Sequence, residues 1–204
     1  MQTTIPQMKG YVPYEYKVVI NPHQDLMNKI IAVRKSFDET YKTDLPIKSV
    51  PEVLLCTFTQ YKAIEQRILH RLRLISMAVP AVKVEIRNFG TFPTHTIYLD
   101  VTTKVPLGNL VKKIRQEAGH LMKQDSDNKP HFITESFYIP VARKLKPWQH
   151  EKGWLEYGNK HFTSTFIAKN LIILSRKKGE FNYKPIARYE FLNQPIETKQ
   201  GELF

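Results

Sequence analysis

The chain has 204 residues, 42% of them hydrophobic and 11% aromatic, which is enough apolar material to build a hydrophobic core. Its 31 Lys and Arg side chains against 19 Asp and Glu leave a formal charge of +12, which favours polyanionic partners such as RNA or nucleotides. The only cysteine, Cys56, excludes an internal disulfide and a thiolate metal cluster, and no stretch reaches the ~20 apolar residues of a membrane span. We therefore expect a cytoplasmic protein with no membrane contact.

The first half of the chain alternates between strand and helix patterns. Short apolar runs and period-two alternation predict strands, whereas apolar residues three or four positions apart predict helices. In chain order, the elements are a strand at 16–20, a helix with Leu26, Ile30, Val33 and Phe37 on its apolar face, a strand within 47–59, a helix with Ile64, Ile68, Leu72 and Ile75, and a strand at 82–86.

The second half repeats this order. Its elements are a strand at 97–101, a helix with Leu107, Leu110, Val111, Ile114, Ala118 and Leu121, a polar loop at 124–129, a strand at 138–142, a helix from Pro147 to about Tyr157, and one long strand at 162–174. The unit of strand, helix, strand, helix, strand thus occurs twice, with spacings of about 35 and about 41 residues that a surface loop can reconcile.

This duplication predicts an α+β fold of two lobes. We expect one domain over 1–204, in which two pseudo-symmetric lobes place two antiparallel-rich sheets on either side of a central cleft, with the helices outside. The motif strands of the lobes lie near 51–59 and 137–143, and the polar tail at 195–204 is expected to fray. Ligands favour clefts between lobes.

Three short segments carry a family resemblance. Residues 48–51 read Lys-Ser-Val-Pro before the first motif strand, 89–93 read Phe-Gly-Thr-Phe-Pro, and 142–147 read Ala-Arg-Lys-Leu-Lys-Pro after the second motif strand. With the duplicated pattern, they resemble the 2'-5' RNA ligase and cyclic phosphodiesterase family, the two-histidine phosphoesterases, over roughly residues 16–189.

The resemblance implies a specific chemistry. Each family motif reads roughly Pro-His-x-Thr, and the register of a strand points the His and the Thr into the cleft together. One His acts as general base and the other as general acid on a phosphodiester or a 2',3'-cyclic phosphate, while the Thr hydroxyls hold phosphoryl oxygens. The family uses no metal and no other cofactor.

This chain departs from the pattern at all four of these positions. Glu52 and Tyr138 stand where the family has its histidines, and Leu54 and Pro140 stand where it has its threonines. General acid or base catalysis contributes about 10² to 10⁴-fold per group, so most of the family's rate enhancement should be absent. An unpaired Glu52 carboxylate would also repel a phosphate.

Other residues could take over part of the site. Glu52 could accept a proton and Tyr138 could donate one, which would make a rebuilt acid–base pair. Arg143 is expected at the rim of the cleft, where it could contact a ligand, and Tyr98 could stack on a base. His131 and His161 are weaker candidates, because His131 lies three residues from Thr134 and His161 has no partner motif.

The remaining features favour structural roles. Trp148 and Trp154 are expected to pack against a sheet, and Cys56 is expected to be a core thiol. The basic clusters, which are expected to be mostly solvated, are Arg67, Arg71 and Arg73; Lys112, Lys113 and Arg115; Arg143, Lys144 and Lys146; and Arg176, Lys177 and Lys178.

Our leading hypothesis is a catalytically degenerate relative of this family whose cleft binds an RNA end or a nucleotide. The alternative is an active phosphoesterase that acts on a 2',3'-cyclic phosphate or a 2'-5' phosphodiester with the rebuilt Glu52 and Tyr138 site. A third hypothesis is an interaction or dimerisation module with an exposed apolar patch. The sequence does not determine the oligomeric state.

Overall fold

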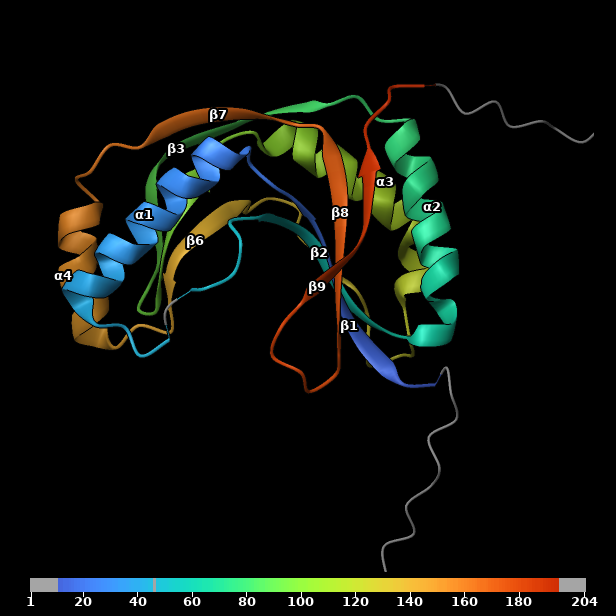
Figure 1. Ribbon diagram of the computed structural model, residues 1–204, viewed down its shortest axis with the longest axis horizontal. Helices are drawn as coiled ribbons and strands as arrows, with labels where there is room; N and C mark the ends of the chain where they lie inside the picture. Colours follow the sequence, from blue (N-terminus) through green and yellow to red (C-terminus); the bar gives the residue numbers. More distant parts are fainter. Residues whose placement is uncertain (1–10, 46, 195–204) are drawn as a thin grey trace, which may run out of the picture.

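The computed structural model describes residues 11–45 and 47–194, so the predicted fraying of 195–204 lies outside the described residues (Figure 1). The helices are α1 (Gln24–Tyr41), the 3-10 turn η1 (Lys62–Ile64), α2 (Glu65–Met77), α3 (Lys104–Met122) and α4 (Pro147–Tyr157). The strands are β1 (Pro13–Ile20), β2 (Val53–Tyr61), β3 (Val82–Phe92), β4 (Thr96–Val101), β5 (His131–Phe132), β6 (Tyr138–Arg143), β7 (Thr163–Ala168), β8 (Asn170–Lys177) and β9 (Lys184–Glu190).

The strands form two antiparallel sheets. The first has the order β5-β2-β1-β8-β9, and the second has the order β6-β4-β3-β7. The helices lie outside, with α1 and α4 on one side of the molecule and α2 and α3 on the other (Figure 1). The predicted α+β class and its duplicated two-lobed arrangement are therefore confirmed.

Two of the helices link the halves crosswise. β1 belongs to the first sheet, but the helix that follows it, α1, packs on β6 of the second sheet. Conversely, β4 belongs to the second sheet, and α3, which follows it, packs on β2 of the first. Each sheet is thus covered partly by a helix whose preceding strand lies in the other sheet.

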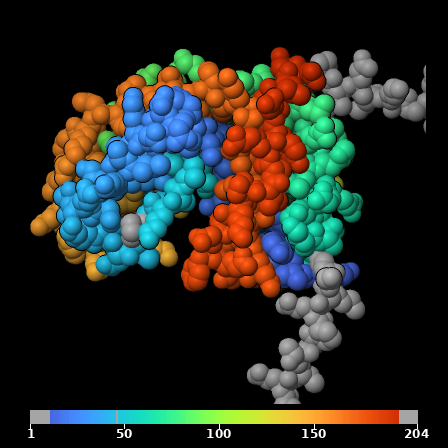
Figure 2. Space-filling model, in the orientation of Figure 1, coloured from blue at the N-terminus to red at the C-terminus, as the bar shows by residue number. Residues whose placement is uncertain are grey.

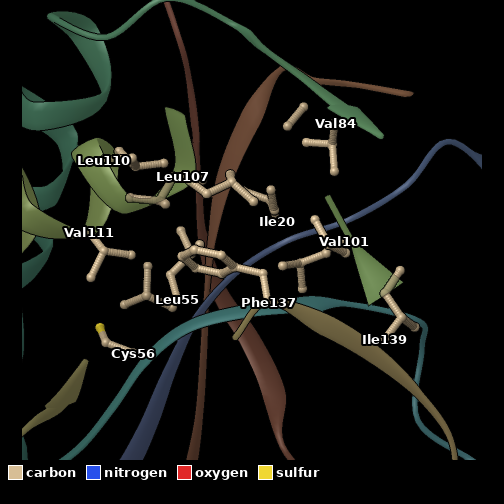
Figure 3. Close-up of a cluster of buried hydrophobic side chains, with 14 of the residues drawn as sticks. Ile20, Leu55, Cys56, Val84, Val101, Leu107, Leu110, Val111, Phe137 and Ile139 are labelled. Atoms are coloured by element: carbon tan, nitrogen blue, oxygen red, sulfur yellow. The ribbon is translucent and has the colours of Figure 1, made fainter. Parts of the chain in front are cut away.

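A single apolar cluster occupies the junction of these layers. Figure 3 shows Leu55 of β2, Phe137 and Ile139 together with apolar side chains of α3. Because alternate residues of a strand face opposite ways, burying Leu55 and Ile139 turns Leu54 and Pro140 toward the other faces of their sheets. Cys56 belongs to the same cluster, where burial raises the pKa of its thiol, so the expected core thiol is confirmed.

The predicted long strand at 162–174 is wrong. This segment divides into β7, which pairs with β3 in the second sheet, and β8, which pairs with β1 in the first. The chain passes between the sheets at Lys169, and periodicity along one strand carries no information about which neighbour it pairs with. The sequence reading also missed β9, the partner of β8.

The burial of several helix side chains differs from the pattern that the sequence predicted. On α1, Arg34 is buried and Val33 is only half-buried, and on α3, Met122 is buried whereas Leu121 is half-buried. Trp148 is 49% exposed, so its predicted core packing is wrong, whereas Trp154 does pack against the core. None of the described helices is long and apolar enough to cross a membrane.

Candidate functional site

The two motif strands meet at one cavity of about 110 Å³. All four positions that the resemblance matches to the family's histidines and threonines line it, together with residues of β1, α1 and the segments before the motif strands. The complete lining is Lys17, Arg34, Ser49, Val50, Glu52, Leu54, Ile133, Ser136, Tyr138, Pro140 and Arg143. The sequence therefore located the cavity through Glu52, Leu54, Tyr138, Pro140 and Arg143, although it did not show that they would share one enclosed space.

Local backbone geometry explains why these side chains converge. Glu52 directly precedes β2 and is two residues from Leu54, and Tyr138 is two residues from Pro140 on β6. In extended backbone, side chains two residues apart point the same way. β6 is an edge strand that pairs only with β4, and an edge is where a sheet tolerates a proline such as Pro140. In Figure 2, the segment leading into β2 (cyan) lies between α1 (blue) and the β8–β9 hairpin (orange to red).

Arg34 is the principal cavity residue that the sequence analysis missed. Only 6% of its surface is exposed, and it reaches the cavity from α1. Its Nε donates to the carbonyl oxygen of Pro140 at 2.9 Å, and its Nη1 donates to the carbonyl oxygen of Ser49 at 2.7 Å. Arg34 thereby links the backbone of the segment before β2 to the backbone of β6. It has no carboxylate partner among the described residues.

The cavity carries an excess of positive charge. Lys17, Arg34 and Arg143 line it, and Glu52 is its only carboxylate within the described lining. Lys17 Nζ lies 3.0 Å from Glu52 Oε1, so the carboxylate is paired. Burial lowers the pKa of Arg34 to about 10, the nearby Arg143 adds to the lowering, and Glu52 opposes it. Arg34 nevertheless stays charged near neutral pH.

A group of three aromatic rings adjoins the cavity. Tyr138 lines the cavity, and its ring centroid lies 4.9 Å from that of Tyr98 and 5.1 Å from that of Phe92. Tyr98 does not line the cavity itself. Its ring lies across Gly90, where a Cβ atom would come within 2.4 Å of the ring, so only glycine allows this placement. Burial raises the pKa of Tyr98, and the Asp100 carboxylate adds to the shift.

A second hollow of about 330 Å³ adjoins β1 and β2 beside the cavity. Its lining includes Thr57, His131 and Tyr183. The ring of Tyr183 connects it with the cavity, because Lys17 Nζ lies 4.5 Å from the ring centroid and the Arg176 guanidinium lies 4.4 Å from it.

The structure separates the histidines from the motif cavity. His131 is exposed and pairs with Thr57 across β5 and β2, so it belongs to the second hollow. His161 is exposed in the segment just before β7, and no residue of β7 is in the described lining of the cavity. No imidazole is present in the described lining of the cavity. Within 11–45 and 47–194, no group of three or more His, Cys, Asp or Glu side chains could hold a metal ion.

One sequence signal could have revealed Arg34. Arg34 lies within the buried stripe of α1. The other members of this stripe are Leu26, Ile30, Phe37 and Tyr41. A charged residue at an apolar-face position is seldom buried unless its donors are satisfied, so it marks a special site. Nothing in the sequence around Lys17 marked it as a cavity residue. Its contact with Glu52 arises only because β1 pairs with β2 in the folded chain.

No family model matches the sequence, and no curated protein matches it. Solved structures do match its fold. One described as a phosphoesterase is 13% identical, with 88% of this chain and 98% of that chain covered and a TM-score of 0.62. Escherichia coli LigT in complex with 3'-AMP is 11% identical, with 88% and 98% covered and a TM-score of 0.59. TT0787 of Thermus thermophilus is 10% identical, with 89% and 100% covered and a TM-score of 0.57.

At these identities the likeness concerns the fold. The chain has the same fold as these structures, one of which is described as a phosphoesterase and another of which is E. coli LigT, as the family resemblance predicted. LigT has also been solved in complex with phosphate.

Proposed function

We propose that this chain is a catalytically degenerate relative of the 2'-5' RNA ligase and cyclic phosphodiesterase family that binds the phosphate end of a nucleotide or an RNA. One observation carries the proposal: Glu52, Leu54, Tyr138 and Pro140 line a single cavity that also contains Arg143 and two further cations. The cavity retains a place for an anion at the position of the family's catalytic centre, while the residues that would perform the family's chemistry are replaced.

The loss of catalysis is argued from side-chain chemistry. The motif positions offer no imidazole for proton transfer at neutral pH, and Leu54 and Pro140 have no hydroxyl to hold a phosphoryl oxygen. Glu52 could serve as a base, but Lys17 already holds its carboxylate in an ion pair. The Glu52 carboxylate therefore contacts Lys17 instead of standing free to approach a substrate.

Anion binding is argued from the charges. The Glu52 carboxylate is offset by Lys17, which leaves Arg34 and Arg143 to attract a phosphate. Arg34 uses two nitrogens for backbone carbonyls, and its Nη2 has no acceptor among the described residues. A guanidinium with free donors in a partly desolvated cavity suits a phosphate oxygen.

The aromatic group favours a nucleotide over a bare phosphate. Tyr138 belongs both to the cavity and to the group with Tyr98 and Phe92, so a phosphate in the cavity would place its attached nucleoside near these rings. Stacking of a base on an aromatic ring is worth about 1–3 kcal/mol. That LigT, which has the same fold, was solved with 3'-AMP supports this choice of ligand class.

The test is calorimetric titration of 3'-AMP at low salt. We expect binding that weakens at least about fivefold in R143Q, because the variant loses one phosphate-facing charge, and changes less than about twofold in K144Q. Lys144 is the matched control, because it is the exposed neighbour of Arg143 and does not line the cavity. Absence of binding to the wild-type protein at low salt would refute the proposed function.

A second measurement tests the degeneracy. RNA ending in a 2',3'-cyclic phosphate is incubated with excess protein under single-turnover conditions, beside the E52A variant. We expect no turnover by either protein. Turnover that disappears in E52A would instead establish the rebuilt Glu52 and Tyr138 site. We also infer a cytoplasmic location from the lone, reduced Cys56, which cell fractionation would test.

A further inference from the structure

The two helical layers of the molecule differ in charge. α2 and α3 together carry seven Lys and Arg side chains against two glutamates, whereas α1 and α4 carry four against five acidic side chains. α2 and α3 pack directly on each other and form one side of the molecule, away from α1 and α4 (Figure 1). The overall charge of +12 is therefore unevenly distributed between the layers.

The basic layer results from two clusters that are distant in the sequence. Arg67, Arg71 and Arg73 belong to α2, and Lys112 and Arg115 belong to α3. All five side chains are exposed, and none takes part in a salt bridge with a described residue. The sequence reading treated each cluster as a solvated helix face, but helix packing places both on one surface.

The two glutamates of this layer do not neutralise it. Glu65 is buried and accepts hydrogen bonds from Tyr16 and Lys62. Glu117 is paired with Lys113 on the same helix at 3.6 Å. Each carboxylate thus has its own cation, which leaves the charges of Arg67 and Arg71 without compensation.

A hollow of about 370 Å³ lies between the helices at this surface. Arg67, His70 and Arg71 line it from α2, and His120 lines it from α3. The other lining residues are Gln66 and Leu121, so no carboxylate belongs to its described lining. Arg67 and Arg71 are four residues apart, which sets them about 6 Å apart along one side of the helix. The hollow is an electropositive concavity built from side chains rather than an isolated exposed arginine.

The surface lacks the anchors of a protein interface. Protein interfaces rely on buried aromatic and aliphatic side chains, and the exposed large apolar residues of the helices are mainly Ile31, Trp148 and Leu155 on α1 and α4. On α2 and α3 the corresponding set is Val105 alone, at the start of α3. A surface with exposed Lys and Arg side chains but few exposed apolar ones is suited to bind a phosphodiester backbone. Such a backbone carries closely spaced negative charges, and proteins bind it by neutralising its phosphates with cationic side chains.

We propose that the α2–α3 face, defined as the hollow with Arg67, Arg71, Arg73, Lys112 and Arg115 around it, binds the phosphodiester backbone of a polynucleotide. This surface is distinct from the motif cavity, and its binding does not rest on the proposed function. A polynucleotide bound there is held along its backbone, independently of sequence and of the chemistry of its ends.

The test is fluorescence anisotropy with a labelled RNA of about 20 nucleotides and a DNA of the same sequence, both with hydroxyl ends, so that neither offers a terminal phosphate to the cavity. We expect R67Q/R71Q to weaken binding about tenfold and to lower the slope of log affinity against log salt by about 1–2 between roughly 50 and 200 mM salt. The matched control, K29Q/K152Q, removes one exposed charge from α1 and one from α4, neither of which forms a salt bridge with a described residue, and should change affinity less than about twofold.

Two further comparisons identify the ligand class and test whether it binds at the α2–α3 face. Comparison of RNA with DNA identifies which backbone is preferred, and tight binding of poly-glutamate of matched charge would overturn the assignment to nucleic acid. R67Q/R71Q should keep the circular dichroism spectrum and the urea midpoint of the wild-type protein, which shows that the variant is folded. If the wild-type protein binds the oligonucleotide but not 3'-AMP, the proposed function fails and this inference stands. No oligonucleotide binding at low salt, or equal weakening in R67Q/R71Q and K29Q/K152Q, overturns it.

Discussion

The family resemblance matches Glu52 to a catalytic histidine, and Lys17 Nζ lies 3.0 Å from the Glu52 carboxylate. The sequence suggested that this carboxylate would repel a phosphate, by about 4 kcal/mol for an unpaired charge at ~4 Å and an effective dielectric near 20. The ion pair reduces that repulsion, because Lys17 contributes an opposite charge within the same cavity. Glu52 is therefore compatible with a bound anion but still opposes it.

Removing this carboxylate should strengthen anion binding. We expect E52Q to bind 3'-AMP about fivefold more tightly than the wild-type protein, because the cavity loses its one acidic group and Lys17 becomes free to face the phosphate. Titration at low and at moderate salt measures the effect, which should shrink as salt screens the charges.

The matched control is E15Q. Glu15 lies on β1 and, like Glu52, is paired with a cation, in this case Arg176, but it lines the neighbouring hollow. Its substitution should leave the affinity for 3'-AMP within about twofold of wild type. Weaker binding by E52Q than by E15Q would contradict the assignment of Glu52 as an unfavourable group for the anion.

Arg34 illustrates what a single side chain can do for both stability and the site. Its two hydrogen bonds satisfy backbone carbonyls of Pro140 and Ser49, which come from segments far apart in the sequence. The same guanidinium contributes charge to the cavity. The position on α1 was readable from the helical pattern, but the partners were not, because they depend on where β6 and the segment before β2 come to lie.

At the scale of elements, two helical glycines should respond oppositely to the same substitution. A Cβ atom at Gly153 of α4 would lie 2.8 Å from ring atoms of Phe37 on α1, whereas a Cβ atom at Gly119 of α3 would meet Phe132 at an ordinary 3.5 Å. Alanine favours a helix over glycine by about 1 kcal/mol at both positions. Only at Gly153 does the close contact between helices oppose this gain.

We expect G153A to lower the free energy of unfolding by about 1–2 kcal/mol, because overpacking exceeds the gain in helix propensity. G119A should raise the free energy of unfolding by up to about 1 kcal/mol. Urea denaturation of both variants measures the difference. Equal stabilisation of the two proteins would show that α1 and α4 are not held as closely as the structure indicates.

The motif strands show how far element prediction reached. Residues 138–142 were predicted as a strand and β6 spans Tyr138–Arg143, and α4 has its predicted limits. The segment 162–174 was predicted as one element and forms two, because the chain changes sheets at Lys169 without losing its apolar pattern. Strand content is thus visible in periodicity, whereas pairing is not.

At the scale of the molecule, the crosswise helices bind the two sheets to each other. α1 and α3 each follow a strand of one sheet and pack on the other, so neither sheet has its complete apolar cover without the partner half of the chain. We propose on this basis that the lobes form one cooperative domain, as the sequence analysis expected for 1–204.

Cooperative unfolding is the corresponding prediction. Trp148 and Trp154 both lie on α4, so tryptophan fluorescence reports on the layer of the second sheet, whereas far-ultraviolet circular dichroism reports on all elements. We expect the two signals to give one common urea midpoint. The G119A substitution in α3, on the other layer, should shift both signals equally. Two separate midpoints would show that the lobes unfold independently.

The charge distribution is also a property of the whole molecule. Each basic cluster of α2 and α3 is unremarkable along the sequence, and the sequence analysis expected solvated helix faces. Packing of α2 on α3 joins the clusters, while α1 and α4 collect most of the helical acidic residues. The polynucleotide surface that we infer therefore exists only at the level of the folded chain.

By itself, the sequence predicted most strands and helices and the duplicated two-lobed arrangement, and its family resemblance implies that all four motif residues are replaced. These follow from local periodicity and from residue identity at matched positions, which need no knowledge of distant contacts. Only the tertiary structure decided that Arg34 enters the cavity, that Lys17 pairs with Glu52, that residues 162–174 serve two sheets and that two basic clusters share one face. Each of these depends on which segments pack together in space, and periodicity along the chain does not encode that choice.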